Sequence, residues 1–483
     1  MSDIRTLLRD RLPSTYMTFP GDPDYDEARA TWNIRTRYRP LGIVQPTNVG
    51  EIQAVLECVR QSNVDQVTVR SGGHSFEGLG LGGEDDKALV VDLVKLNKVE
   101  IRQQEAVAIL EGGALLGDLY REAWNHGELM VPAGSCVAVG VGGQIQCGGY
   151  GHYTRTYGIL ADRVLQCEVV TADGRLLVAD ENINSDLFWA VLGNGTGSYG
   201  IITKIKIKLN EAPKGVATFS FKYRRSDIDF VETFTALQDY ALSMPTSVNP
   251  WICVWLGDVE FVGAILAETE EQRDALIEDM RAELPPGAQH EIRTVTFLES
   301  VRHFGLTQTS APWYSNMDTI ERERDEHLRY MTIRAGFIPE PFTDEFIERL
   351  AEVVEKQPTT GSRIQLVSMD PTGGPPVDAT SIPTRGGPWA MGMSSWLELA
   401  DFPDEATLIQ EGKERDVWLD QAYETFYPYS AGGYIGDDDM KEGAHGRDIY
   451  ASYWGTHLPR LKEIKRKYDP TNLFHHKLSI PLD

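Results

Sequence analysis

The sequence predicts an α+β protein made of at least two domains, and three observations support this fold class. The chain has 483 residues, too many for one ordinary hydrophobic core. Up to about residue 215, short β-branched runs alternate with helical patterns and glycine-rich loops. Beyond that point, the mixture of strands and amphipathic helices is typical of an antiparallel sheet that is covered by helices.

The first part of the chain contains a β-α-β unit. The run at 42–46 (GIVQP) indicates a strand, and residues 49–62 have the apolar spacing of an amphipathic helix with Thr47 or Asn48 as its N-cap. The run at 64–69 (VDQVTV) indicates a second strand, which leads into the sequence RSGGH. The helix is therefore expected to cross between the two strands and to bury its apolar face.

The histidine of this RSGGH sequence follows two glycines, which allow a sharp turn or a close approach of backbone. His74 then lies either in a tight surface turn or facing a ligand for which the glycines make room. A second concentration of glycine occurs at positions 134, 140, 142, 143, 148, 149 and 151. The Val, Ile and Cys residues between them are unusual in a flexible linker, so this backbone is expected to pack against a large ligand.

The later elements are a hairpin at 163–179, with its turn at Asp173-Gly174, and the strands and helices of the second domain. In that domain the runs 217–223 and 251–257 indicate strands, and 270–284 indicates an amphipathic helix.

Composition narrows the possible partners. The 72 acidic residues outnumber the 46 basic ones and give a formal net charge of −26, which disfavours nucleic acid and anionic membranes as partners. An anionic cofactor can still bind through backbone N–H groups. No stretch approaches 18 uninterrupted apolar residues, and the first 19 residues do not resemble a signal peptide. A cytoplasmic protein is therefore expected, unless a leader has been removed, and the oligomeric state stays open.

The five cysteines, at positions 58, 136, 147, 167 and 253, do not form a recognisable framework. No CxxC pair and no Cys/His set with zinc spacing occurs, so no metal site is expected. The odd number argues against a disulfide framework. Each cysteine is by default a buried apolar residue.

Five segments together resemble the vanillyl-alcohol-oxidase/PCMH flavoprotein superfamily and, within it, the berberine-bridge-enzyme-like oxidases. They are RSGGHSFEG at 70–78, PAGSCVAVGVGGQIQCGGYG at 132–151, RTYGILADRV at 155–164, DLFWAVLGNGTGSYGIIT at 186–203 and YDPTNLFHHKLSIP at 468–481. Their order and spacing cover nearly the whole chain. The resemblance implies a PCMH-type FAD-binding domain of two subdomains at 1–215, an α+β substrate domain at 216–440, and a segment at 441–483 that returns to the first domain.

The resemblance also implies a bicovalent FAD, bonded through His74 to the 8α-methyl group and through Cys136 to flavin C6. The backbone N–H groups of 70–74 and of the turn at 140–143 are expected to hold the pyrophosphate. The implied cofactor-binding residues are His74, Cys136, Arg70, Ser71, Gly72, Gly73, Gly134, Val139, Gly140, Gly142, Gly143, Gly151, Gly200 and Ile202. Leu192, Asn194 and Thr196 depart from the family's commoner sequence, so the finer contacts of that loop stay open.

For catalysis, the resemblance places a tyrosine base at Tyr434 and its aspartate partner at Asp370. A free tyrosine has a pKa of about 10, so such a base needs help from its surroundings. An ordinary strand tyrosine and a turn aspartate are the alternatives. Tyr150 and Tyr153 are the next candidates for the base. Further candidates are His152 and Arg155; Gly436 stands where relatives carry asparagine.

The implied reaction removes a hydride from an alcohol carbon of a sugar, oligosaccharide or hydroxylated natural product. Val139 occupies the position that controls oxygen access in the family, where valine is typical of oxidases, so O2 is the expected acceptor and H2O2 the product. A natural-product tailoring enzyme or a dehydrogenase stays open, and a flavin carrier without turnover is disfavoured. Tryptophans at 251, 255, 313, 389, 396 and 418 either stack on substrate or pack the core.

Overall fold

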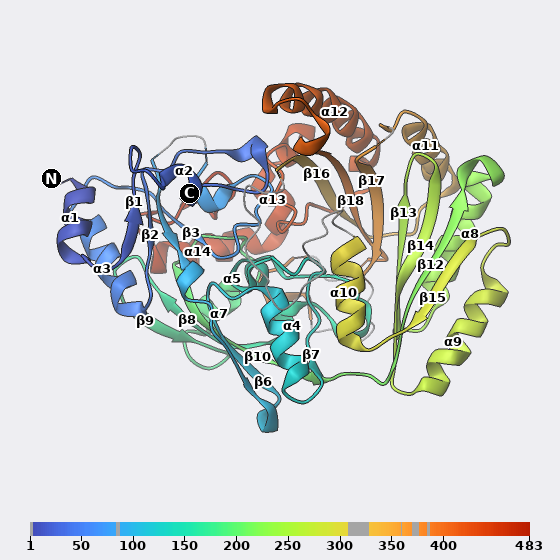
Figure 1. The fold of residues 1–483 in the computed structure, drawn as a ribbon, viewed down its shortest axis with the longest axis horizontal. Coiled ribbons are helices and arrows are strands. Elements are labelled where there is room, and N and C mark those ends of the chain that lie inside the picture. The colour runs from blue at the N-terminus through green and yellow to red at the C-terminus, as the bar shows by residue number, and fades with distance from the viewer. Residues whose placement is uncertain (1–2, 84–86, 308–327, 359, 370–375, 384–386) are drawn as a thin grey trace.

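Three larger sheets and one two-stranded ribbon carry the fold in the part of the chain that the structure describes (Figure 1). The structure is a computed structural model and describes all residues except 1–2, 84–86, 308–327, 359, 370–375 and 384–386. The predicted α+β class is confirmed. None of the helices in the described ranges is both long and apolar enough to cross a membrane.

The first sheet has the strand order β1-β2-β4-β3 and contains the predicted β-α-β unit. Its strands are β1 (Tyr16–Thr18), β2 (Gly42–Gln45), β4 (Leu89–Asp92) and β3 (Val67–Arg70). Helix α3 (Val49–Arg60) connects β2 to β3, and both strands run parallel to β4, which lies between them. Of the two candidate N-caps, Asn48 accepts the N–H of Glu51 at 3.0 Å. Helix α1 (Ile4–Arg11) packs against α3.

Strand β3 begins three residues later than the predicted strand at 64–69. The reason is local, because Val64 still belongs to the turn after α3, where its N–H donates to Ser62 Oγ at 3.1 Å. The strand ends at Arg70, so the glycine pair and His74 follow directly after its C-terminal end.

The second sheet is antiparallel, with the order β5-β6-β10-β8-β9. Its strands are β5 (Val99–Arg102), β6 (Val107–Glu111), β10 (Ile201–Lys208), β8 (Val164–Val170) and β9 (Leu176–Ala179), and β7 (Leu129–Met130) pairs separately with β11 (Asn210–Glu211). The predicted hairpin is confirmed as β8 and β9. Helices α4 (Leu116–Asn125) and α7 (Ser185–Val191) contact this sheet. Helix α5 (Val141–Cys147) lies near α4, and α6 (Thr154–Tyr157) contacts the third sheet described below.

The third sheet is the predicted antiparallel sheet, with the order β15-β12-β14-β13-β17-β18-β16. Its strands are β12 (Gly215–Arg224), β13 (Val248–Val254), β14 (Asp258–Ala267), β15 (Gln289–Thr294), β16 (Arg329–Ile338), β17 (Ser362–Ser368) and β18 (Trp389–Glu398). Four helices cover its outer face: α8 (Phe230–Ser243), α9 (Glu270–Glu283), α11 (Asp344–Glu355) and α12 (Glu405–Phe426). Helix α10 (Phe297–Thr307) lies on the opposite side, next to α4 (Figure 1).

The C-terminal segment, with α13 (Ile449–Trp454) and α14 (Leu458–Tyr468), reaches the first sheet. Its Leu473 carbonyl accepts the N–H of Val67 at 2.9 Å, and Phe474 packs in the core around α3. Lys465 is fully buried and donates to Asp469 and to the carbonyls of Ser198 and Phe474. The buried ammonium group is thus fully hydrogen-bonded, as burial of a charge requires.

Candidate functional site

A cavity lies between the end of β3, the start of α5 and the inner face of the third sheet. Of the residues that the sequence marked for cofactor or catalysis, those that line it are Arg70, Ser71, Gly72, Gly73, His74, Gly134, Cys136, Val139, Gly140, Gly142, Gly143, Tyr150, Gly200, Ile202 and Tyr434. Segments far apart in the chain therefore meet at one site.

His74 and Cys136 lie next to each other among the residues that line this cavity. The Nε2 atom of His74 lies 3.3 Å from Cys136 Sγ. The imidazole ring stacks on Trp32, with 5.1 Å between ring centroids and 28° between planes. The Arg70 side chain stabilises the end of β3, because its buried guanidinium forms an ion pair with Asp92 at 2.7 Å.

The wall beside His74 is made of closely packed backbone. A Cβ atom on Gly72 would lie 2.2 Å from the Gly140 nitrogen, and one on Gly140 would lie 2.2 Å from the Gly72 nitrogen. Ser71 Oγ donates to the Gly112 carbonyl at 2.6 Å and ties a third segment to the same place. Only glycine fits at either position, so the two glycine-rich segments are interlocked.

Replacing Gly72 by alanine is expected to disrupt the close packing between Gly72 and Gly140. The methyl group would meet backbone on Gly140, which cannot move aside as a flexible side chain can. Overpacking of this kind costs about 1–3 kcal/mol, so we expect a lower unfolding temperature and less flavin per chain, measured by calorimetry and absorbance. Gly257→Ala, where a Cβ meets nothing within 4 Å, is the control. Full flavin content in Gly72→Ala would contradict the expectation.

A second group of polar residues lies where the segment 434–438 meets the loop after α5. The Tyr434 and Tyr150 rings are 4.6 Å apart between centroids. The Gly149 N–H donates to the Tyr434 hydroxyl oxygen at 3.2 Å, and the Tyr150 hydroxyl donates to Asp437 at 3.2 Å. Gly436 has a clear role here, because a Cβ at that position would lie 2.4 Å from the Tyr434 ring. An asparagine could not occupy this position with the tyrosine in its present place.

The protonation of this group follows from its surroundings. Burial, together with the charge of Asp437, raises the pKa of both Tyr434 and Tyr150 well above 10. The Gly149 N–H opposes this for Tyr434, and the charge of Arg363 opposes it for Tyr150. Burial raises the pKa of Asp437 to about 6, so its carboxylate is still largely ionised at neutral pH and can accept a proton.

The inner face of the third sheet supplies the wall opposite the tyrosines. Along β17 the side chains alternate, as a strand requires: Arg363 and Gln365 line the cavity while Ile364 and Leu366 pack under the helices. Among the residues that the structure describes, Arg363 Nε and Gln365 Oε1 have no hydrogen-bond partner. Trp251 adds an aromatic surface from β13. This wall can therefore offer both stacking and hydrogen bonds to a bound molecule.

Some predicted residues do not reach the cavity. The Tyr153 hydroxyl pairs with Ser300 at 3.1 Å and its ring packs on Phe297 in the core. Gly151 packs against the Ala133 carbonyl instead of forming part of the cavity wall. Asp370 lies outside the described residues, as does Trp313.

The remaining aromatic and basic candidates pack internally. His152 is stacked between Trp251 and Phe304, and Arg155 is buried against carbonyls near β13. Trp389 packs in the core under the helices, and Arg363 lies over the ring of Trp255.

Several residues that line the cavity were not predicted from the sequence. Asp437 belongs to the acidic run GDDD, which by composition alone suggests a solvated turn. Arg363 and Gln365 show only the alternation that is typical of a strand, and Trp32 lies outside every motif considered above. His476 belongs to the segment at 468–481, but no role was assigned to it there. His476 lines the cavity near Thr196, whose carbonyl accepts its Nε2–H at 2.8 Å, and burial lowers the pKa of His476 to about 4.

The cavity suits a flavin dinucleotide. Its glycine walls allow backbone N–H groups to approach a large anionic ligand, which explains binding by a strongly acidic protein. Within the described ranges, the buried Ser135 Oγ at the cavity has no hydrogen-bond partner, as expected of a group that bonds to a ligand. Imidazole and thiol lie at one place, and both can bond to an electron-poor ring.

Comparison with known proteins agrees with this geometry. Residues 40–180 match the family described as "FAD binding domain", and residues 434–481 match "Berberine and berberine like". The chain is 28% identical to the FAD-linked oxidoreductase dpmaF of Metarhizium anisopliae, over 95% of this chain and 88% of that protein. It is 28% identical to monolignol oxidoreductase AtBBE-like 13 of Arabidopsis thaliana (92% and 84%) and 25% identical to chitooligosaccharide oxidase of Gibberella zeae (95% and 91%).

Solved structures share the fold over the full length of both chains. Physcomitrella patens BBE-like 1 superposes with a TM-score of 0.87 at 22% identity. The glucooligosaccharide oxidase of Acremonium strictum, described with 6-S-cysteinyl, 8α-N1-histidyl FAD, superposes with a TM-score of 0.84 at 23% identity. The chain is thus an FAD-linked oxidoreductase with an FAD-binding domain at 40–180 and a berberine-like segment at 434–481, and it is similar over most of its length to berberine-bridge-enzyme-like proteins.

Proposed function

We propose that the protein oxidises an alcohol carbon of a sugar, an oligosaccharide or a hydroxylated natural product, with O2 as the electron acceptor and H2O2 as the product. The observation that carries this proposal is the pairing of the Tyr434, Tyr150 and Asp437 group with His74 and Cys136 in one cavity. The names of relatives that oxidise chitooligosaccharides and monolignols support an alcohol as substrate.

FAD would be held by covalent bonds to His74 and Cys136 and by backbone N–H groups of residues 70–74 and 140–143. When bound, it supplies N5 as the hydride acceptor. The 3.3 Å between the histidine nitrogen and the cysteine sulfur supports attachment of both side chains to one ring system. The covalent flavin in the glucooligosaccharide oxidase structure supports the same assignment.

The protein's own part in the reaction is to move a proton. Tyr434 is the proposed base for the substrate hydroxyl, and Tyr150 beside it already donates to Asp437. Because the pKa of both tyrosines is raised, neither is a free phenolate at neutral pH, and the proton must be passed on as it is taken up. Within the described residues, Asp437 is the proposed acceptor of this proton. It takes the role that the family resemblance gave to Asp370.

Val139 is proposed to leave room for O2. Its side chain lines the cavity close to Cys136 in the chain. We expect Val139→Leu to slow reoxidation of the reduced protein by O2 and to leave anaerobic reduction by substrate near normal, because the larger side chain obstructs access only for O2. Stopped-flow absorbance measures both half-reactions. Equal slowing of the two would contradict a role in oxygen access.

A natural-product tailoring oxidation is the second candidate. The identity to the monolignol oxidoreductase is as high as that to any relative named above, and Trp251 with Arg363 would suit an aromatic alcohol as well as a sugar ring. A dehydrogenase differs from both only in its acceptor.

A substrate panel tests the proposal. The purified, flavin-loaded protein is mixed with oligosaccharides in one set and with aromatic and other natural-product alcohols in another, with peroxide detection. Peroxide formation identifies the substrate class. Anaerobic bleaching of the flavin without peroxide in air would assign a dehydrogenase. Failure of every alcohol to bleach the flavin would overturn the proposed reaction.

A further inference from the structure

The loop that carries His74 is held by a buried carboxylate from the C-terminal part of the chain. Asp438 accepts a hydrogen bond from Ser75 Oγ at 2.5 Å and another from the Phe76 N–H at 2.9 Å. Ser75 and Phe76 are the two residues that follow His74. Asp438 is 5% exposed and stands four residues after Tyr434 in the segment that lines the cavity.

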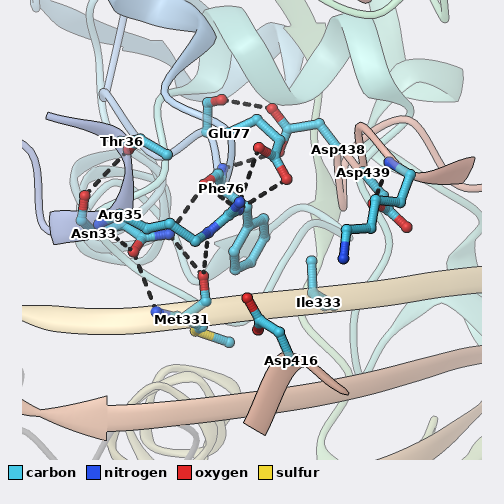
Figure 2. A network of polar contacts seen from close by, with 12 residues as sticks. Asn33, Arg35, Thr36, Phe76, Glu77, Met331, Ile333, Asp416, Asp438 and Asp439 are labelled. Atoms are coloured by element: carbon cyan, nitrogen blue, oxygen red, sulfur yellow. Dashed lines mark hydrogen bonds and ion pairs between the residues drawn. The ribbon is translucent and has the colours of Figure 1, made fainter. Parts of the chain in front are cut away.

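The opposite side of the same loop is bound as well. Asn33 Nδ2 and Arg35 Nη2 donate to the Phe76 carbonyl at 3.0 and 3.2 Å, and both side chains also donate to the Met331 carbonyl on β16. Arg35 forms an ion pair with Glu77 at 2.8 Å. Figure 2 shows this network around Phe76, with Asp438 on one side and the strand carrying Met331 on the other. The peptide groups of Phe76 are thus fixed at both N–H and carbonyl.

This fixation sets the direction of the His74 side chain. The Cα–Cβ bond of a residue follows its backbone, so hydrogen bonds at the next two residues restrict the backbone from which the His74 side chain projects. Stacking on Trp32 and the 3.3 Å approach to Cys136 Sγ then complete the placement of the ring. A group held in the reacting geometry before its partner arrives reacts faster.

Burial of Asp438 has a free-energy cost that its two hydrogen bonds offset. Burial raises the pKa of this carboxyl to about 7, against the hydrogen bond from Ser75 and the charge of Arg35, which favour the ionised form. Within the described residues, the hydrogen bonds of this buried carboxyl go to the loop after His74, so the effect of its burial is expected to appear at His74.

We propose that Asp438 is the positioning residue for covalent attachment of FAD at His74; this inference rests on the covalent attachment proposed above. The new bond joins an imidazole nitrogen to the 8α carbon and replaces one N–H and one C–H bond. Two protons and two electrons leave, and dioxygen as the oxidant takes them up as hydrogen peroxide. Asp438 takes no proton in this account and acts through the position of His74.

The test counts only the His74 bond, by using Cys136→Ala as the background. Covalent flavin is the fraction that stays with acid-precipitated protein, confirmed by intact mass, and it is followed during incubation with added FAD in air. Asp438→Ala should slow its formation about 10- to 100-fold, the usual effect of a lost hydrogen bond to a charged group. Total flavin before precipitation should stay near the background value.

Three further variants separate positioning from a general loss of structure. Asp438→Asn should recover most of the attachment rate, since its amide oxygen still accepts from Phe76. Ser75→Ala should slow attachment, Ser75→Thr should not, and Ser75→Ala should add little to Asp438→Ala. Glu405→Gln, which breaks the partly exposed Arg37–Glu405 pair in the same part of the fold, is the control. These Ser75 variants keep the test informative if Asp438→Ala does not fold.

The outcomes are distinct. Normal attachment in both Asp438→Ala and Ser75→Ala, with His74 bonded in the background protein, would overturn the positioning role alone. No covalent flavin in the background or in the unmutated protein would overturn the proposed attachment, and this inference with it.

Discussion

Replacing Tyr434 by phenylalanine is expected to lower the rate constant for flavin reduction by substrate at least about 100-fold. A positioned base contributes about 10²- to 10⁴-fold, and this substitution removes the hydroxyl while it keeps the ring that packs against Tyr150. The measurement is anaerobic stopped-flow absorbance with the substrate found in the panel. Flavin content and the unfolding temperature should stay near the wild-type values.

Tyr153→Phe is a matched control, because that tyrosine comes from the neighbouring turn but its hydroxyl contacts Ser300 in the core. Gly436→Ala gives a second variant, in which the hydroxyl is retained but the added methyl displaces the Tyr434 ring. We expect it to be slow as well. If Tyr434→Phe reduces its flavin at a near-normal rate, the base is not Tyr434, and the hydroxyl bonded to Asp437 becomes the next candidate.

Replacing both His74 and Cys136 by alanine is expected to abolish covalent flavin altogether. Acid denaturation of the wild-type protein should leave the yellow colour in the pellet and an intact mass that is higher by one FAD. His74→Ala should keep its flavin through Cys136 alone, and Cys136→Ala through His74 alone, since the two side chains lie 3.3 Å apart but come from separate segments. The double variant should release all of its colour to the supernatant.

Peptide mapping assigns each bond, and Cys147→Ala serves as the control because that thiol lines the cavity but burial raises its pKa and so disfavours the thiolate. Release of the colour from the wild-type protein would remove both linkage assignments while the fold would stand. Retention of covalent flavin in the double variant would show that a third residue forms the bond.

The sequence by itself determined the α+β class, the β-α-β unit and the hairpin at Asp173-Gly174. These features depend on local signals, namely side-chain periodicity and turn residues. The meeting of the two glycine-rich segments around His74 and Cys136 was implied by the family resemblance of those segments, because the contact itself joins Gly72 to the distant Gly140. The position of Asn48 as cap and the late start of β3 needed only a few neighbouring residues to decide.

Only the tertiary structure decided which polar residues act at the cavity. Tyr150 and Tyr153 are separated by only two residues. The Tyr150 hydroxyl nevertheless bonds to Asp437 at the cavity, and the Tyr153 hydroxyl bonds to Ser300 in the core. The aspartates of GDDD look alike in sequence, but Asp437 contacts Tyr150, Asp438 holds the loop after His74, and Asp439 pairs with Arg334. Such contacts join residues more than a hundred positions apart, and no local pattern encodes which side of a packed segment each side chain will face.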